Sequence, residues 1–312
     1  NRVGILDGGQ LGLMLGQAAK KMGYTVLAYA PPGERHPVQS VADHFFCGEY
    51  TQEFRLGEFA DAVGLEGVIT SQFENVDLRS LQYLESRRCK VAPSSSVFAV
   101  AQDRFKEKGF AAKLGIPTTV YCNVMDVLCG AIASATFLPG IVKTARLGYD
   151  GHGQQRVKNM DELRRFQPKL RRVSYILERQ VDFDYEMSVI IARNGRGEER
   201  IFPAVKNTHK GGILRETHYK NGGIPPDVEE QARYFTRRLA STLEVVGLLA
   251  VEYFVTKDGG VLFNEMAPRA HNSGHWTIEG CKTSQFSACM QAMFGEPFGD
   301  FETAREAHMC NL

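Results

Sequence analysis

The N-terminal part of the chain alternates between short apolar runs and segments with helical spacing. Residues 2–6 are apolar and stop at Asp7-Gly8-Gly9, which predicts a buried strand and a tight turn. Residues 11–22 carry apolar side chains three and four positions apart, which predicts a helix that Gly23 ends. A second apolar run follows at 24–29. A strand, a helix and a strand of these lengths form a βαβ crossover, so we expect a parallel sheet.

Two further short strands, at 67–71 and 90–92, complete an α/β domain over residues 1–102. Residues 103–114 form a predicted helix that Gly115-Ile116-Pro117 ends. Beyond residue 120 the pattern becomes α+β, with helical stretches at 161–170 and 228–246. The strands predicted there are 140–144, 175–177, 187–192, 201–205, 248–255 and 260–263.

Composition and charge narrow the class of protein. Hydrophobic residues make up 43% of the 312 residues and charged residues 23%, which excludes collagen-like, disordered and coiled-coil chains. With 37 basic and 36 acidic residues the net charge is +1, so no global field favours nucleic acid or an anionic membrane. The most apolar stretch, 127–142, is too short and too polar to span a bilayer.

The seven cysteines are scattered and include no CxxC pair, which favours neither a disulfide framework nor a zinc knuckle. A reducing compartment is the simplest interpretation, and the strand at the start of the chain leaves no room for a signal peptide. The expected location is therefore the cytoplasm.

Four segments carry candidate chemistry. The first is the turn at 7–12, between a strand and a helix, whose backbone N–H groups can hold an anion. A nicotinamide dinucleotide site would need Gly where Asp7 stands and an acid where Ala30-Pro31 ends the second strand. The alternative is a turn that serves helix–strand packing only.

The second segment, 143–154, places Lys143 and Arg146 at the end of a strand and before a Gly-rich loop. Glycines let a backbone close over phosphates, and a lysine supplies a point charge. The lysine precedes the glycines, so this is not a P-loop. A hairpin without a ligand is the alternative.

The third is the carboxylate pair Glu252 and Glu265, on two apolar strands joined by a turn at Asp258-Gly259-Gly260. A hairpin would let the two carboxylates face each other, and such groups are costly to bury unless they are paired or bind a metal. Oxygen ligands beside phosphates suit Mg²⁺. The alternative places both side chains in solvent.

The fourth segment, 268–277, concentrates Arg269, His271, Ser273 and the single tryptophan without hydrophobic periodicity, which is typical of a binding loop. A solvated surface loop is the alternative, and no HExxH pattern indicates zinc. The backbone of residues 176–181 could bind a purine, and Glu186 could accept hydrogen bonds from a ribose. Residues 73–75 follow a strand end, where α/β sheets bind ligands.

In order along the chain, GGQLG at 8–12, FEN at 73–75, QDR at 102–104, KTARLGYDG at 143–151 and NEMAPRAHNSGHWT at 264–277 resemble the N5-carboxyaminoimidazole ribonucleotide synthetases, which are ATP-grasp enzymes. The resemblance spans nearly the whole chain. It implies a Rossmann-like domain (1–102), an ATP-grasp domain (103–292) with a mobile lid at about 120–180, and the start of a truncated small C-terminal domain (293–312).

The resemblance also implies a reaction. ATP phosphorylates bicarbonate to carboxyphosphate, and the exocyclic amine of 5-aminoimidazole ribonucleotide takes up the carboxyl group, which yields ADP and phosphate. The product belongs to de novo purine (IMP) biosynthesis. ATP and two Mg²⁺ ions are expected, together with a cytoplasmic homodimer and with no nucleic-acid or membrane partner.

Site residues follow from the same resemblance. The ATP site comprises Arg104, Lys143, Gly148, Tyr149, Asp150, Gly151, His152, Gly153, Gln154, Glu178, Arg179, Gln180, Val181, Glu186, His209, Asn264 and Glu265. The substrate site comprises Gln10, Leu11, Glu74, Tyr149, Asp150, Arg269, His271 and Ser273. The implied catalytic residues are Asp150, Arg269 and His271, and the implied metal ligands are Glu252 and Glu265.

The chain departs from the family pattern at Asp7 (usually Gly), Leu13 (often Arg), His152 (Lys or Arg) and Lys206 (often Glu). It also stops at residue 312, whereas the family continues with basic residues that grip the substrate phosphate, so weak ribonucleotide binding is expected. The rival interpretations are another ATP-grasp ligase, such as a formate-dependent glycinamide ribonucleotide transformylase or a biotin carboxylase, and a nucleotide-binding module without turnover.

Overall fold

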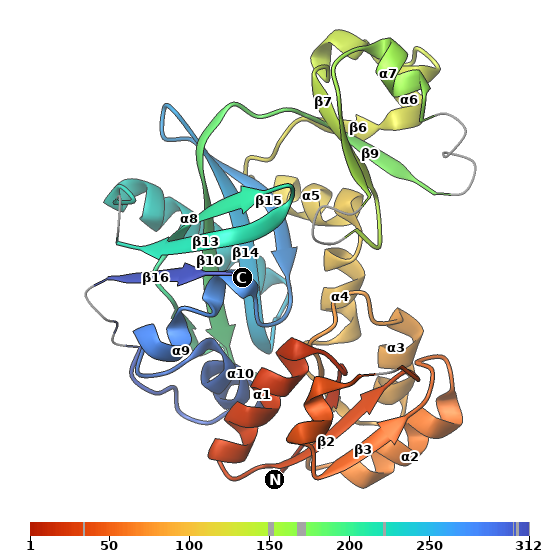
Figure 1. The fold of residues 1–312 in the computed structure, drawn as a ribbon, viewed down its shortest axis with the longest axis vertical. Helices are drawn as coiled ribbons and strands as arrows, with labels where there is room; N and C mark the ends of the chain where they lie inside the picture. Colours follow the sequence, from red (N-terminus) through yellow and green to blue (C-terminus); the bar gives the residue numbers. More distant parts are fainter. Residues whose placement is uncertain are drawn as a thin grey trace.

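The computed structural model describes residues 1–33, 35–148, 153–166, 173–220, 223–301, 303 and 306–311. Its strands form three sheets, which Figure 1 shows as a lower, an upper right and a central left body. The Gly-rich segment 149–152, and with it Tyr149, Asp150, Gly151 and His152, lies outside the described residues.

The N-terminal sheet has five parallel strands in the order β3-β2-β1-β4-β5. Helix α1 packs on one face against α10, while α2 and α3 cover the other face around Phe59 and Leu81. The elements are β1 (Arg2–Leu6), α1 (Gln10–Lys21), β2 (Thr25–Ala30), η1 (Pro37–Ser40), β3 (His44–Cys47), α2 (Glu53–Val63), β4 (Val68–Ser71), α3 (Leu78–Ser86) and β5 (Lys90–Val91).

A four-stranded antiparallel sheet, in the order β6-β9-β7-β8, forms the upper right body of Figure 1. It has its own core, which includes Val142, Leu163 and Leu177. This is the region predicted as the lid. Its elements are β6 (Tyr121–Asn123), α6 (Val124–Leu128), η2 (Ser134–Thr136), β7 (Gly140–Thr144), β8 (Gln154–Val157), α7 (Met160–Arg164) and β9 (Tyr175–Arg179).

The largest sheet has the order β15-β14-β10-β12-β13-β16, with β11 paired to β10. Strand side chains alternate between two cores: Val189 and Val251 pack towards α8, whereas Ile190 and Ala250 pack towards α10. The elements are β10 (Phe183–Arg193), β11 (Glu199–Ile201), β12 (Val205–Lys210), β13 (Ile213–Tyr219), α8 (Pro226–Thr242), β14 (Gly247–Thr256), β15 (Val261–Ala267), η4 (Asn272–Gly274), α9 (Thr277–Gly280), α10 (Gln285–Phe294) and β16 (Ala307–Cys310).

Helices α4 (Ser95–Ala101) and α5 (Arg104–Lys113) connect the N-terminal sheet to the other two. The Asp103 carboxylate caps α5 by accepting hydrogen bonds from the backbone N–H groups of Phe105 (3.0 Å) and Lys106 (3.3 Å). Since α5 packs on β15, the cap fixes where the charged residues of its first two turns lie.

The parallel N-terminal sheet and the hairpin β14–β15 confirm the sequence predictions. The single strand predicted at 201–205 is wrong, because it is the end of β11 and the start of β12 with Pro203 between them. Proline has no N–H to continue a ladder. The predicted helix 228–246 begins two residues earlier and ends at Thr242, and the one predicted from 161 ends at Arg164.

All seven cysteines are free thiols, as their spacing predicted. Among the described residues, no helix combines the length and apolar character that crossing a membrane requires.

The substitution Phe59→Ala tests the core between the N-terminal sheet and α2. Phe59 is fully buried in that core, so we expect a loss of about 3–5 kcal/mol in the free energy of unfolding. Phe54→Ala on the same helix is the matched control, because Phe54 is 75% exposed and its loss should change stability by about 0.5 kcal/mol or less. Urea denaturation followed by circular dichroism measures both, and equal losses would contradict this packing.

Candidate active site

A cavity of about 640 Å³ opens where the three sheets face one another. Its walls come from β7 and β8 of the four-stranded sheet, from β10, β12, β14 and β15 of the large sheet, and from the loop after β4. The predicted site residues that line it are Glu74, Arg104, Lys143, Gly148, Gln154, Glu186, His209, Glu252, Asn264, Glu265, Arg269 and His271.

Glu252 and Glu265 stand directly opposite each other on β14 and β15, as the hairpin prediction required. Each carboxylate has a cationic or polar partner from another element: Arg104 Nη1 lies 2.8 Å from Glu265 Oε2, and His271 Nε2 lies 3.1 Å from Glu252 Oε1. Burial tends to raise the pKa of Glu265, but the charges of Arg104 and Lys143 outweigh it and hold that pKa at about 2. Glu265 is therefore an anion at neutral pH.

The bulge after Glu252 brings a third oxygen to this hairpin. The register between β14 and β15 shifts between Glu252 and Tyr253, so Asn264 has no direct cross-strand partner. Its backbone oxygen accepts a hydrogen bond from Lys108 Nζ (2.9 Å), but its side-chain Oδ1 is buried and has no hydrogen-bond partner. Two carboxylates and one unpaired amide oxygen thus share one wall of the cavity.

A buried charge cluster lies beside this wall. Glu178 at the end of β9 is 2% exposed, and its Oε2 accepts from Lys143 Nζ at 2.9 Å while its Oε1 lies 3.4 Å from Lys108 Nζ. Burial would raise the pKa of Glu178, yet the two ammonium groups lower it to about 2. The ionised Glu178 therefore joins β7 of the four-stranded sheet to α5.

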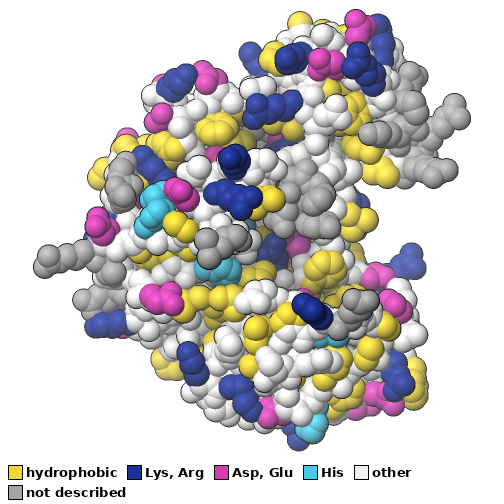
Figure 2. Space-filling model, viewed as in Figure 1, with side chains coloured by type: hydrophobic (Ala, Val, Ile, Leu, Met, Phe, Trp, Pro, Cys, Tyr) yellow, Lys and Arg dark blue, Asp and Glu magenta, His cyan; other side chains and the backbone are white. Residues whose placement is uncertain are grey.

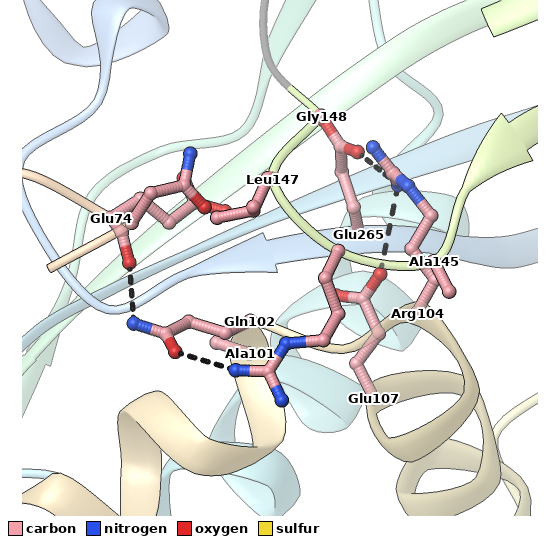
Figure 3. A pocket seen from close by; sticks show the side chains of 11 residues that line it. Glu74, Ala101, Gln102, Arg104, Glu107, Ala145, Leu147, Gly148 and Glu265 are labelled. Carbon is pink, nitrogen blue, oxygen red and sulfur yellow. Dashed lines mark hydrogen bonds and ion pairs between the residues drawn. The ribbon is translucent and has the colours of Figure 1, made fainter. Parts of the chain in front are cut away.

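Figure 3 shows a small pocket around Arg104 that shares Glu74, Gly148 and Glu265 with the cavity. The Arg104 guanidinium points to Glu265 and also lies 3.8 Å from Glu107. Gln102 donates to the backbone oxygen of Glu74 (2.9 Å) and accepts from Arg146 (3.4 Å). These contacts connect the loop of the N-terminal sheet to the start of α5.

The loop after β15 links the N-terminal sheet to the cavity. Arg269 Nη2 lies 2.7 Å from Glu74 Oε2, in an ion pair between segments far apart in sequence. His271 Nδ1 hydrogen-bonds Ser273 Oγ (2.8 Å), which also accepts from Ser188 on β10 (2.7 Å). Ser273 is fully buried, so it positions the His271 ring rather than facing the cavity.

On the β12 side of the cavity, His209 Nδ1 lies 2.6 Å from Glu186 Oε2. Burial disfavours the imidazolium, but the hydrogen bond to Glu186 and the charge of Glu252 raise the pKa of His209 to about 9. His209 is therefore a cation at neutral pH and compensates the acidic hairpin.

The turn at 7–12 is occupied by the chain itself. The Asp7 carboxylate accepts hydrogen bonds from the backbone N–H groups of Gly9 (2.7 Å) and Gly12 (2.8 Å). Burial raises the pKa of Asp7, and these bonds oppose that shift. Two of the N–H groups that were expected to hold an anion, those of Gly9 and Gly12, are thus already bound by Asp7.

Several residues that were predicted to belong to the site do not line the cavity. Gln10 is exposed at the start of α1, and Leu11 packs against the core of the N-terminal sheet. Arg179, Gln180 and Val181 follow β9, where the backbone of Arg179 bonds Val120 and that of Gln180 bonds Pro139. Gly153 closes the turn before β8.

Sequence reasoning missed Glu107, Lys108 and Arg156. A usable signal existed for two of them: Arg104, Glu107 and Lys108 repeat at helical spacing on one face of α5. That face continues into the buried Ala111, so it points inwards although it is charged.

The comparisons with known proteins agree with this geometry. Residues 109–286 match the model of the ATP-grasp domain, and residues 1–102 match that of the ribonucleotide synthetase preATP-grasp domain. The N5-carboxyaminoimidazole ribonucleotide synthase of Brucella melitensis is 38% identical over 317 residues, which cover 99% of this chain and 85% of that protein. The fold and the site thus define an ATP-grasp protein.

Solved structures support a narrower assignment. An N5-carboxyaminoimidazole ribonucleotide synthetase in complex with ADP superposes with a TM-score of 0.92 at 36% identity and covers 99% of this chain and 81% of that one. The Aspergillus clavatus enzyme, in complex with ADP and 5-aminoimidazole ribonucleotide, superposes with a TM-score of 0.88 at 25% identity and covers 99% of this chain and 81% of that one. The chain belongs to the N5-carboxyaminoimidazole ribonucleotide synthase family.

The His209–Glu186 pair makes a pH-dependent prediction. Because the folded-state pKa of His209, about 9, exceeds the ordinary value of 6.5, its charge stabilises the fold fully below 6.5, and this contribution is lost as the pH rises towards 9. The stability difference between the unsubstituted protein and His209→Gln should therefore shrink over that interval.

Nitrogen-15 NMR of the histidine rings measures the same charge directly. Glu186→Gln should lower the titration midpoint of His209, whereas Glu66→Gln, at a side chain that is 96% exposed on the N-terminal body, should leave it unchanged. A His209 midpoint near 6.5 that ignores Glu186 would refute the assignment.

Proposed function

We propose that this protein is an ATP-grasp ligase that carboxylates the exocyclic amine of 5-aminoimidazole ribonucleotide, forming N5-carboxyaminoimidazole ribonucleotide in purine biosynthesis while ATP is cleaved to ADP and phosphate. The observation that carries the proposal is the facing pair Glu252 and Glu265, in a cavity that also holds Arg104 and the Arg269–Glu74 ion pair. Such a wall suits the transfer of a phosphoryl group between two anionic reactants.

ATP is bound between the four-stranded and the large sheet. Lys143 and Arg104 both line the cavity and supply positive charge for the phosphates, and Gly148, Gly153 and Gln154 belong to the Gly-rich hairpin beside them. The strand end from Glu178 to Val181 offers backbone groups to adenine. Glu186 accepts from the ribose, and His209 lies beside it.

The donor set at the hairpin fits Mg²⁺. Glu252 and Glu265 are directly opposite each other on the cavity wall where phosphates are proposed to lie, and the neighbouring Asn264 Oδ1 atom is buried without a hydrogen-bond partner. When bound, Mg²⁺ supplies charge neutralisation for the phosphoryl oxygens. The ion pair from Arg104 to Glu265 and the contact of His271 Nε2 with Glu252 hold both carboxylates in place.

The proposed carboxylation has two steps. A bicarbonate oxygen attacks the γ-phosphorus of ATP and ADP leaves, which gives carboxyphosphate. The amine nitrogen then attacks the carboxyl carbon, the C–O bond to phosphate breaks, and the amine loses a proton. Arg269 and His271 are proposed to bind and orient bicarbonate and the imidazole, with Asp150, Tyr149 and Glu74 on the substrate side.

Carboxyphosphate must be kept from water, and the four-stranded sheet is proposed as the lid that excludes it. The proposed domains are 1–102, 103–292 and 293–312. The seven free thiols are consistent with a reducing, cytoplasmic environment, and the proposal of a homodimer derives from the family resemblance.

Phosphate release from ATP tests the function. We expect release that requires bicarbonate, that rises on addition of 5-aminoimidazole ribonucleotide, and that yields the carbamate in equal amount. Stimulation by formate with glycinamide ribonucleotide instead would identify the rival ligase. Nucleotide binding without release under any condition would identify a binding module.

Glu265→Gln tests the role of the hairpin. Removal of one of the two facing charges weakens the binding of Mg²⁺ and therefore its stabilisation of the transition state. Mg²⁺-dependent turnover should fall by about 100-fold or more, while the circular dichroism spectrum stays unchanged. Glu66→Gln, the same exchange at an exposed position, should keep full activity. Near-normal turnover of Glu265→Gln at the Mg²⁺ concentration used for the unsubstituted protein would show that Glu265 is not a metal ligand.

A further inference from the structure

A second group of metal-ligating side chains lies on the other edge of the large sheet, away from the acidic hairpin. Strands β13 and β16 pair antiparallel, with Glu216 opposite Cys310 and His218 opposite His308. Residues two apart on a strand share a face, so these four side chains form one square of neighbours. We call them the β13–β16 cluster.

The opposite face of the same strand pair explains why the cluster points outwards. Tyr219 of β13 stacks on Trp276, and Ala307 and Met309 of β16 pack against the same small core. The alternating residues His308 and Cys310 are exposed, and His218 is 22% exposed. Figure 2 shows histidine (cyan) beside an acidic side chain (magenta) on the left of the molecule, over the region where Figure 1 draws β13.

The distances within the cluster match a metal coordination sphere. Glu216 Oε2 lies 3.1 Å from His218 Nε2 and 3.7 Å from His308 Nε2. Cys310 Sγ lies 3.5 Å from His308 Nε2. Tetrahedral zinc, with Zn–N and Zn–O distances near 2.0–2.1 Å and Zn–S near 2.3 Å, separates its ligand atoms by roughly 3.3–3.6 Å. The ligand atoms of Glu216, His218 and His308 therefore already lie close together, whereas Cys310 Sγ lies near His308 only and must move towards the other two residues to become the fourth ligand.

Within the described part of the chain, Glu216, His218 and His308 are the only group of three such residues whose ligand atoms all lie within 4.8 Å of one another. The two imidazole rings stack with their centroids 4.2 Å apart, and the buried Nδ1 of His218 has no hydrogen-bond partner, so Nε2 is the nitrogen that faces the cluster. A carboxylate between two imidazoles supplies charge that a divalent cation neutralises.

We propose that the β13–β16 cluster is a zinc site, with Glu216, His218, His308 and Cys310 as ligands. The mixture of imidazole, thiolate and carboxylate selects zinc over Mg²⁺, which prefers oxygen ligands only. Since two ligands come from each strand, the metal fastens β16 to the edge of the large sheet. Its role is structural and separate from the cavity.

Titration of the tag-free 312-residue chain with Co²⁺ tests the site, because cobalt in a zinc site absorbs in the visible and a cobalt–thiolate bond absorbs in the near ultraviolet. We expect one equivalent to bind, Zn²⁺ to displace it, and Zn²⁺ to raise the thermal unfolding midpoint. His218→Ala and His308→Ala should each weaken binding at least about tenfold, and Cys310→Ser should remove the near-ultraviolet band.

The controls are His44→Ala and Cys47→Ser, at exposed positions on β3, which should leave the cobalt spectrum and the zinc-dependent shift unchanged. Circular dichroism and ATP binding verify that the cluster variants are folded. A cobalt spectrum that persists in the double variant His218→Ala/His308→Ala would place the metal elsewhere. The absence of any cobalt or zinc binding at millimolar metal would equally overturn the proposal.

Discussion

The structure depends on two carboxylates that face each other across the β14–β15 hairpin. Glu252 and Glu265 repel each other unless cations lie close by, and like charges at a directly opposite strand position are destabilising. The compensating cations come from elements that are distant in sequence, Arg104 at the start of α5 and Lys143 from the four-stranded sheet, while His271 Nε2 in the loop after β15 contacts Glu252. The acidic pair thus gathers α5, the four-stranded sheet and the loop after β15 around one cavity.

Charge pairing also connects the N-terminal sheet to the loop beside the acidic hairpin. The Arg269–Glu74 ion pair connects the loop of the N-terminal sheet to the loop that carries His271, and Gln102 holds Glu74 from the other side. Asp7, meanwhile, accepts hydrogen bonds from the N–H groups of Gly9 and Gly12 beside the start of α1. The N-terminal sheet presents Glu74 to the cavity.

Local patterns sufficed for part of this architecture. Apolar runs and Gly turns predicted the βαβ unit and the hairpin, and with the hairpin the facing of Glu252 and Glu265, because those features depend on neighbours in sequence. The Lys143–Glu178–Lys108 cluster could not be predicted, since three charges are buried only when strands and a helix from separate segments meet. The β13–β16 cluster could not be predicted for the same reason. Each strand contributes two of its residues, and which residues lie opposite each other depends on how the two strands pair in the sheet.

We propose that bicarbonate is phosphorylated in this cavity before the amine is carboxylated. A single-turnover reaction with oxygen-18-labelled bicarbonate, ATP and 5-aminoimidazole ribonucleotide tests it directly, with mass spectrometry of the released phosphate. Because carboxyphosphate breaks at its C–O bond, each released phosphate should carry one oxygen from bicarbonate. Phosphate that contains oxygen only from ATP and water, alongside normal ADP formation, would contradict it.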